Sequence, residues 1–386
     1  MRSVFTIGLA LAATTAALVH CSASGDDNGA APGNETEAGT AETSTDATTA
    51  PDTDDDAGGN DAGDAGKAHC SPDHWCREPL PSPDLVLSAV WSFAPDDAFA
   101  VGDSGMIHWD GKTWSLVPGG DGGLEGLTGL WASGPNDIWA VASGQHRLLH
   151  GTRASGGSIS WTTLETDGGP TRDHVTGTAP GDVWTAGVED DGTQVLEHAV
   201  SVDGGAPTFS KLVIPDSPFF TNGLFVSAGD ELWIAGSGDA AAVVLHAKKK
   251  ANVYAWDTSL DTTGQPFTFF PAIWGDSANE IWVLGAKADH YHRSALADGG
   301  GAWSPIANHV SVAMTSVWGS GKNDVWAVGY FGAIRHWDGS AWTVSQIAVN
   351  GTPIYQMLAS VHGSSATDVW AVGAGVALHR TIGGEP

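Results

Sequence analysis

Positive charge is scarce in this sequence. Its 386 residues include 16 lysines and arginines against 45 aspartates and glutamates, which gives a formal net charge of −29 at pH 7. This balance opposes binding to nucleic acid or to an anionic lipid surface, because both carry charge of the same sign. The one basic cluster, Lys248 to Lys250, falls at a predicted hairpin end and is interpreted as a solvated turn. We therefore expect no nucleic-acid partner.

Long apolar runs are also scarce. One such run, residues 4–18, begins two residues after Arg2, and it is too short for a comfortable transmembrane helix. A short charged region followed by an apolar run of this length is typical of a signal peptide. The sequence therefore predicts an exported protein that does not span the membrane.

Cysteine occurs three times, as Cys21, Cys70 and Cys76. The segment from Leu18 to Cys21 resembles a bacterial lipobox, which implies that Cys21 becomes the lipidated first residue and that the membrane is contacted only through this anchor. Lipidation would leave Cys70 and Cys76 as an even pair, and an exported pair of this kind predicts a disulfide.

Ser22, the residue after that cysteine, implies sorting to the outer membrane or cell surface if the lipobox resemblance holds. The alternative is ordinary signal cleavage just after this point. It would give a soluble periplasmic or secreted product.

Residues 22–68 contain no Trp, Tyr, Phe, Leu, Ile or Val. Such a segment cannot bury enough apolar surface to offset the entropy lost on ordering, so we expect it to be disordered. Its twelve acidic residues against Lys67 alone make it self-repelling and extended. We interpret it as an acidic stalk between residues 1–21 and a folded domain over 69–386.

Tryptophan is abundant, and most of the 18 tryptophans follow a repeat. The stretch from Thr315 to Trp342, TSVWGSGKNDVWAVGYFGAIRHWDGSAW, has four short apolar runs separated by three turns, which predicts a four-stranded antiparallel meander. Units of this length, about 45 residues, are typical of β-propeller blades. The unit recurs seven times, and the aromatic residue of its second run is in turn Phe99, Trp139, Trp184, Trp233, Trp282, Trp326 and Trp370.

The second runs are apolar on both faces, as in IWAVA and VWAVG, which predicts burial between two neighbouring sheets. The seventh unit ends at Pro386 without its fourth run, whereas a run around Trp75 precedes the first unit at the spacing of a fourth strand. We therefore predict an all-β, seven-bladed β-propeller that is closed by an N-terminal strand. This closure would limit exposed strand edges.

The pattern SGxNDVWAVG, followed by HWDGxxW, resembles the Trp-rich propeller repeats of secreted bacterial lipoproteins. It is also similar to the Asp-box propellers, which include sialidases and a photosystem assembly factor. The resemblance covers residues 70–386 and implies the fold, but it says little about activity.

A histidine follows each repeat aromatic by 9 to 14 positions. Equivalent residues of a propeller lie on different blades, so these histidines cannot converge on one metal ion. We interpret them as packing residues, and the repeated aspartates, such as Asp137 and Asp324, as turn residues that hydrogen-bond nearby backbone. We expect no metal site and no cofactor.

The connections between second and third strands, and between blades, share one face and are long and varied. Function usually resides on variable loops of a rigid scaffold, and exposed aromatics beside carboxylates suit a protein or carbohydrate ligand. The candidate ligand-binding residues on this face are Arg172, Asp173, His174, Asp190, Asp191, Phe219, Phe220, Tyr291, Tyr330, Phe331 and Tyr355.

These observations favour a monomeric, non-enzymatic propeller at the cell envelope that binds a protein or glycan. One alternative is a glycoside hydrolase or lyase of the Asp-box type. A sialidase would need arginines on the channel strands to pair with a substrate carboxylate, and first runs such as 88–91 and 128–131 contain none. A second alternative is an envelope assembly or scaffold factor.

Overall fold

The computed structural model describes residues 70–382, except for 120–122, 155–156, 166–168, 202–204, 216–219, 228–230, 238–240, 252, 264–268, 286–289, 307–311 and 350–351. The chain divides into two compact units, Met1–Asn60 and Asp61–Pro386, and every described residue belongs to the second. The predicted signal peptide, Cys21 and the acidic stalk lie outside the described residues. Within the described ranges, no helix has the length and apolar character needed to cross a membrane.

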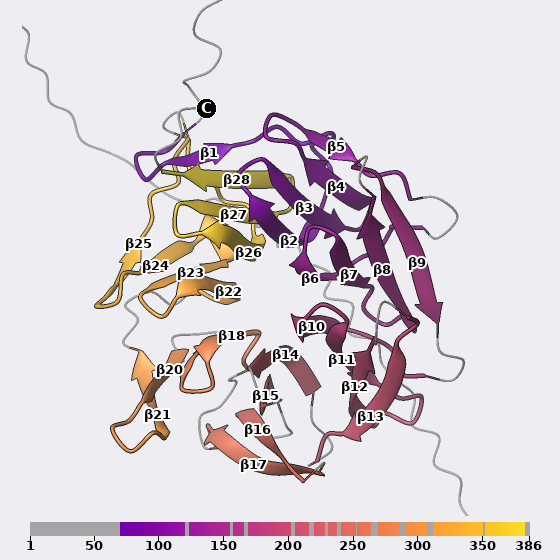
Figure 1. Ribbon diagram of the computed structural model, residues 1–386. Helices are drawn as coiled ribbons and strands as arrows, with labels where there is room; N and C mark the ends of the chain where they lie inside the picture. Colours follow the sequence, from indigo (N-terminus) through magenta and orange to yellow (C-terminus); the bar gives the residue numbers. More distant parts are fainter. Residues whose placement is uncertain are drawn as a thin grey trace, which may run out of the picture. The chain divides into compact units, whose positions relative to one another are not determined.

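The described residues form seven four-stranded antiparallel sheets. Their first strands contact one another around a central axis, as in a β-propeller (Figure 1), so the predicted fold is confirmed. From the inner to the outer strand, blade 1 contains β2 (Leu87–Ala94), β3 (Asp97–Gly102), β4 (Gly105–Trp109) and β5 (Trp114–Leu116), and blade 2 contains β6 (Gly129–Gly134), β7 (Asp137–Val141), β8 (Arg147–Arg153) and β9 (Ile159–Glu165). Blade 3 contains β10 (His174–Ala179), β11 (Asp182–Val188), β12 (Gln194–Val200) and β13 (Thr208–Val213), and blade 4 contains β14 (Phe220–Ser227), β15 (Glu231–Ser237), β16 (Ala242–Lys250) and β17 (Val253–Asp261). Blade 5 contains β18 (Ala272–Ser277), β19 (Glu280–Leu284), β20 (His290–Ala295) and β21 (Gly301–Ile306), and blade 6 contains β22 (Met314–Gly321), β23 (Asp324–Gly329), β24 (Ile334–Trp337) and β25 (Trp342–Val344).

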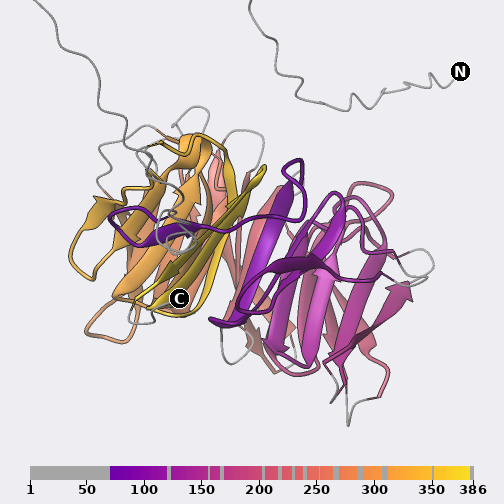
Figure 2. The same ribbon diagram turned by 90° about the horizontal axis from the view of Figure 1, so that it is seen from above.

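Both ends of the described chain build the seventh blade. It contains β26 (Leu358–Ser365), β27 (Asp368–Gly373) and β28 (Val376–Thr381), and its outer strand is β1 (Trp75–Arg77). Both views show the indigo strand β1 against the yellow strand β28 (Figures 1 and 2), and the register places Trp75 opposite Arg380. The predicted N-terminal closure is therefore confirmed.

The side chain of Trp75 anchors this closing strand. It is fully buried, and its ring lies edge-on to Trp326 of blade 6, with 5.4 Å between ring centroids. Its indole N–H donates to Ser345 Oγ at 3.0 Å. The predicted disulfide between Cys70 and Cys76 is present and closes the hairpin that presents this strand.

The repeat aromatics of the second strands pack between neighbouring blades. Trp326 of blade 6, for example, lies in one apolar cluster with Val361 and Val369 of blade 7, and Trp370 of blade 7 lies in another with Val90 of blade 1. All seven aromatics are at most 2% exposed. Burying one large apolar side chain contributes roughly 1.5–3 kcal/mol, so the ring is stabilised by the same contact repeated from blade to blade.

Each repeat aromatic also belongs to a hydrogen-bonded group, which we name the Trp–His–acid cluster. A histidine of the third strand stacks on the aromatic ring, with centroids 3.9–4.5 Å apart. In six blades its Nε2 is within 3.1 Å of a carboxylate two positions before the aromatic. In blade 4 the corresponding distance, His246 to Glu231, is 3.5 Å.

A hydroxyl completes this cluster in four blades. Ser133, Thr178, Ser320 and Ser364 each sit in a β-bulge of the inner strand and donate to the acid four residues later at 2.5–2.7 Å. The repeated histidines and aspartates therefore act together, and the carboxylate lies between the hydroxyl and the imidazole. In that order the histidine cannot take the hydroxyl proton, so the cluster is structural.

Candidate functional site

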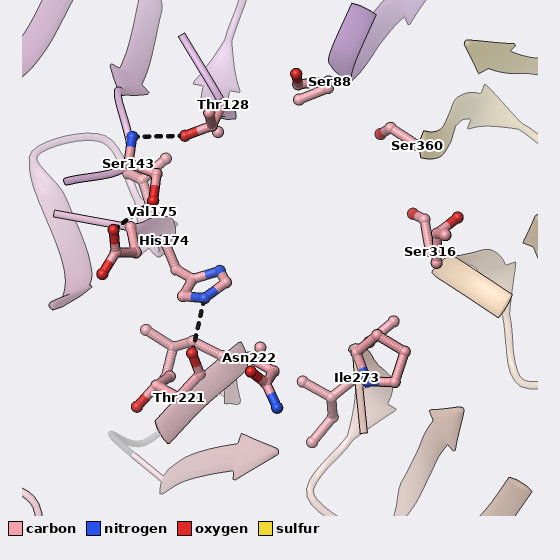
Figure 3. A pocket seen from close by; sticks show the side chains of 18 of the residues that line it. Ser88, Thr128, Ser143, His174, Val175, Thr221, Asn222, Ile273, Ser316 and Ser360 are labelled. Carbon is pink, nitrogen blue, oxygen red and sulfur yellow. Dashed lines mark hydrogen bonds between the residues drawn. The ribbon is translucent and has the colours of Figure 1, made fainter. Parts of the chain in front are cut away.

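A cavity of about 750 Å³ opens at the centre of the ring of inner strands. Its rim includes Ser143 of the β7–β8 connection and Phe269 of the β17–β18 connection. It therefore opens on the face that carries the connections between second and third strands and between blades, which we name the long-loop face. Figure 3 shows side chains from several blades around the open centre.

Two positions of the repeat line this cavity in all seven blades. They lie three and two residues before the first-strand residue that pairs with the repeat aromatic. The first ring is Ser88, Thr128, Asp173, Asn222, Pro271, Thr315 and Ala359; the second ring is Ala89, Gly129, His174, Gly223, Ala272, Ser316 and Ser360.

Irregular pairing of the inner strands directs four of these side chains toward the cavity. The register between first and second strands shifts at Ser88, Asn222, Thr315 and Ala359, each of which is an extra residue in its strand. An extra residue is left unpaired and re-aims its side chain, and such bulges are common next to binding sites. All four line the cavity.

Asp173 and His174 are the ionisable members of the two rings. Asp173 Oδ1 accepts hydrogen bonds from Ser143 Oγ at 2.7 Å and from Gly144 N at 2.9 Å. His174 Nε2 is 3.2 Å from the carbonyl oxygen of Thr221, so this nitrogen donates and Nδ1 is left as an acceptor. Figure 3 shows the Nδ1 edge turned toward the open centre.

The described residues that line the cavity, whose opening on the long-loop face we call the mouth of the central channel, carry a small negative charge. Burial lowers the pKa of His174, although Asp173 and the Thr221 carbonyl act in the opposite direction, so the imidazole is neutral at neutral pH. Asp173 is then the one formally charged side chain among the described residues that line the cavity. No lysine or arginine is among these lining residues, so this part of the chain offers no cationic side chain to pair with a substrate carboxylate.

The predicted ligand-binding residues do not form one site. Asp173, His174 and Phe220 come together at the cavity, where Phe220 is 59% exposed. Asp190 and Asp191 line a separate depression at the β11–β12 turn. Phe219 lies outside the described residues.

Three more predicted residues gather over blades 6 and 7. Tyr330 and Phe331 form a 3₁₀ turn (η2, Tyr330–Gly332) after β23, and Tyr355 lies before β26 and is 70% exposed. Tyr355 lines a second depression together with Arg77.

Two predicted residues are buried, which corrects the expectation that they lie exposed on the loops. Arg172 is fully buried, and its Nη2 is 2.7 Å from the carboxylate of Glu197, so its charge is used inside blade 3. Tyr291 is 9% exposed and packs edge-on against Phe270. Both flank loops in the sequence, but their side chains point into the blade.

The sequence-based prediction missed most residues of the two rings. Examples are Asn222, Thr315 and Ser316, and also Phe269, which is 45% exposed on the rim. The signal was present: polar residues recur at a fixed distance before the first-strand aromatic. The prediction named loop residues, whereas these side chains lie at or just before the starts of the inner strands.

Comparison with known proteins supports the fold. Neither a family model nor a curated protein matches the sequence. Among solved structures, YCF48 bound to D1 peptide matches with a TM-score of 0.60 and 16% identity over 82% of this chain and 99% of that one. YCF48 from Cyanidioschyzon merolae matches with a TM-score of 0.58 and 15% identity, over 80% of this chain and 99% of that one.

A lyase has a similar fold. Catalytically inactive virginiamycin B lyase from Staphylococcus aureus, with quinupristin, matches with a TM-score of 0.57 and 14% identity over 80% of this chain and 99% of that one. At these identities the likeness establishes a shared propeller fold, which unrelated functions use.

Proposed function

We propose that this protein is a non-enzymatic binding module that takes a segment of a protein partner at the mouth of its central channel. The observation that carries the proposal is the cavity to which all seven inner strands contribute. Concave sites with a few convergent polar groups are the usual places where ligands bind. The rings supply hydroxyl, amide, carboxylate and imidazole groups, and Phe220 and Phe269 supply apolar rim surface.

A protein partner is favoured over a small ligand by the exposed aromatics of blades 6 and 7. By strand order, Phe331 and Tyr355 lie on the same face as the cavity. Phe331 is 70% exposed and has a φ of 56°, a left-handed conformation that a bulky residue adopts at a cost. Such strain is often kept at binding sites. A macromolecule can contact these aromatics and the cavity together.

A selection from a random peptide library tests the proposal. Ala359→Trp should fill the mouth without removing a polar side chain. Ala341→Trp, in the exposed β24–β25 turn of neighbouring blade 6 and on the opposite face of the ring, is the matched control. Selected peptides should bind the wild type and Ala341→Trp but not Ala359→Trp. Failure to select any peptide, or equal binding to all three proteins, would exclude the site.

A glycan array with the same three proteins distinguishes the carbohydrate alternative. Binding of a glycan that Ala359→Trp abolishes would assign the cavity to a sugar instead of a peptide. Co-purification with one stoichiometric envelope protein would favour a role in assembly.

A lyase is the second candidate function. It is supported by the likeness to virginiamycin B lyase and by the neutral imidazole of His174, whose Nδ1 faces the cavity and could accept a proton. The test is incubation with quinupristin and mass spectrometry of the products. Turnover that His174→Gln removes would support this candidate.

We also propose that the protein is exported and held at the outer membrane or cell surface through Cys21. The proposal rests on the resemblance to a lipobox and on the apolar run before it. Cys21→Ser should move the protein from the membrane fraction to the soluble fraction. Retention in the membrane fraction would exclude the lipid anchor.

A further inference from the structure

We infer that the mouth of the channel selects a basic side chain, lysine or arginine, on the partner. This inference rests on the proposed function, because it names the chemistry of the group that enters the same cavity.

The first argument is the broken symmetry of the two rings. Five blades place hydroxyls, alanine, glycine or proline at these positions, and blade 4 places Asn222 and a glycine. Blade 3 alone places a carboxylate, Asp173, with His174 beside it. Its charge is therefore not required by the repeat, since the other blades form the same strands without it.

The second argument is how Asp173 is held. Both hydrogen bonds to its carboxylate use Oδ1 and come from the β7–β8 connection of the neighbouring blade. Among the described residues, no hydrogen bond or ion pair involves Asp173 Oδ2. The adjacent Arg172 forms an ion pair with Glu197 inside blade 3. A half-buried carboxylate fixed in this way can still accept from a cationic donor, and such charge-assisted hydrogen bonds are about twice as strong as neutral ones.

The third argument is that the described residues lining the cavity offer a further acceptor and include no lysine or arginine to compete for Asp173. His174 presents Nδ1 and Asn222 presents an amide group at the same cavity, whereas the amide oxygen of Gln194 already accepts a hydrogen bond from Thr221 N at 3.4 Å. Residues 69–386 contain 14 lysines and arginines against 33 aspartates and glutamates, a formal charge of −19. A field of this sign attracts a basic segment and raises its rate of association.

The fourth argument is the apolar rim. Phe220 and Phe269 line the cavity from the starts of neighbouring blades 4 and 5 and are 59% and 45% exposed. Lysine and arginine bury apolar stems while their heads stay in polar surroundings. Aromatic rings also attract cations held over their faces.

A peptide array tests this inference. The probes are a neutral Gly/Ser peptide whose central residue is varied over all twenty amino acids and acetyl-lysine, together with every peptide from the library selection. We expect Lys and Arg peptides to bind at least about tenfold more tightly than Gln or acetyl-lysine peptides, equivalent to about 1.4 kcal/mol. Asp173→Asn should remove this preference. Asp103→Asn, an exposed change of the same kind in the β3–β4 turn, should preserve it.

Asn222→Asp provides an independent test that still applies if the Asp173→Asn variant does not fold. A second carboxylate in the ring should tighten Lys and Arg binding severalfold, with a steeper loss on addition of salt. Selected peptides that bind at the mouth but tolerate Lys→Gln, or that ignore both Asp173→Asn and Asn222→Asp, would overturn the inference and leave the proposed function intact. If no peptide binds at all, the proposed function fails first.

Discussion

The two ends of each blade differ in what they repeat. At one end, the Trp–His–acid cluster recurs in all seven blades with nearly the same geometry. At the other end, the two rings around the cavity hold different side chains in different blades, and one blade holds a charge. A group that every blade needs for packing is repeated, whereas a group used once is not. This difference agrees with a packing role for the first end and with the proposed recognition at the second.

The largest test of this comparison is Trp326→Ala. Trp326 is 2% exposed, and it contacts His336 of its own blade and Trp75 of the closing strand. Removing the ring leaves a cavity between blades, so the free energy of unfolding should fall by about 3–5 kcal/mol. Chemical denaturation measures this change. A stability equal to that of the wild type would contradict the structural role of the repeat aromatics.

A smaller loss is expected for Asp324→Ala. This change leaves the His336 imidazole and the Ser320 hydroxyl without their acceptor. Hydrogen bonds to a charged group contribute about 1.5–3 kcal/mol, and a loss in that range should appear in the same denaturation assay. Asp103→Ala, exposed at the opposite end of blade 1, should change stability by less than about 0.5 kcal/mol. Equal effects of the two changes would remove the distinction between the ends.

Acidification should reveal a further contribution from the packed first strands. His362 stacks on Trp91, and its Nδ1 accepts from Ser92 N. Burial lowers the pKa of His362 from 6.5 to about 3, although Asp368 acts in the opposite direction. Between these pH values only the unfolded chain binds the proton, so stability should fall with decreasing pH by up to about 1.4 kcal/mol per unit.

His362→Phe isolates this effect, because the other histidines titrate equally in both proteins. The wild type should lose stability more steeply than the variant between about pH 6.5 and pH 4. Parallel pH profiles would show that His362 does not carry the effect. A carboxylate such as Asp97 contributes to the pH dependence of stability only at lower pH. Burial would raise the pKa of Asp97, but hydrogen bonds from His108 and Arg153 lower it to about 2.

The smallest effect, and one of opposite sign, is expected for Phe331→Gly. Glycine adopts a left-handed φ without the penalty that phenylalanine has, so stability should rise by up to about 1 kcal/mol. The neighbouring Gly332 cannot be changed in the same way, because a Cβ there would lie 2.1 Å from the carbonyl oxygen of Ile354. If the exposed ring contacts the partner, Phe331→Gly should also weaken peptide binding. A stability loss would instead show that Phe331 packs in the folded protein.

The architecture was predictable because it depends on spacing. The repeat aromatics fixed the number of blades, and Trp75 fixed the closing strand, even though Thr176 and His362 stand where other blades have an aromatic residue. In the structure these two pair with Trp184 and Trp370 in the same register. Apolar periodicity tolerates single exceptions, since neighbouring contacts still determine which face is buried.

The site was harder to predict because it depends on side-chain direction. Arg172 and Asp173 are adjacent in sequence, yet one is fully buried against Glu197 and the other lines the cavity. Successive side chains of an extended chain point to opposite sides, but the side to which a given residue points cannot be assigned until the start of the strand is known. The bulge at Asn222 changes this alternation again. Sequence spacing therefore predicts the position of a blade more reliably than it predicts which side chains face the cavity.

The pairing of β1 with β28 also constrains the time course of biogenesis. Trp75 meets its partner Arg380 about 300 residues later in the chain, so at a synthesis rate of about 5–20 residues per second the first strand waits on the order of 15 to 60 seconds. During that interval a tryptophan destined for complete burial has no native neighbour. Whatever shields this segment from wrong pairings in the meantime decides how much of the newly made protein reaches the closed ring.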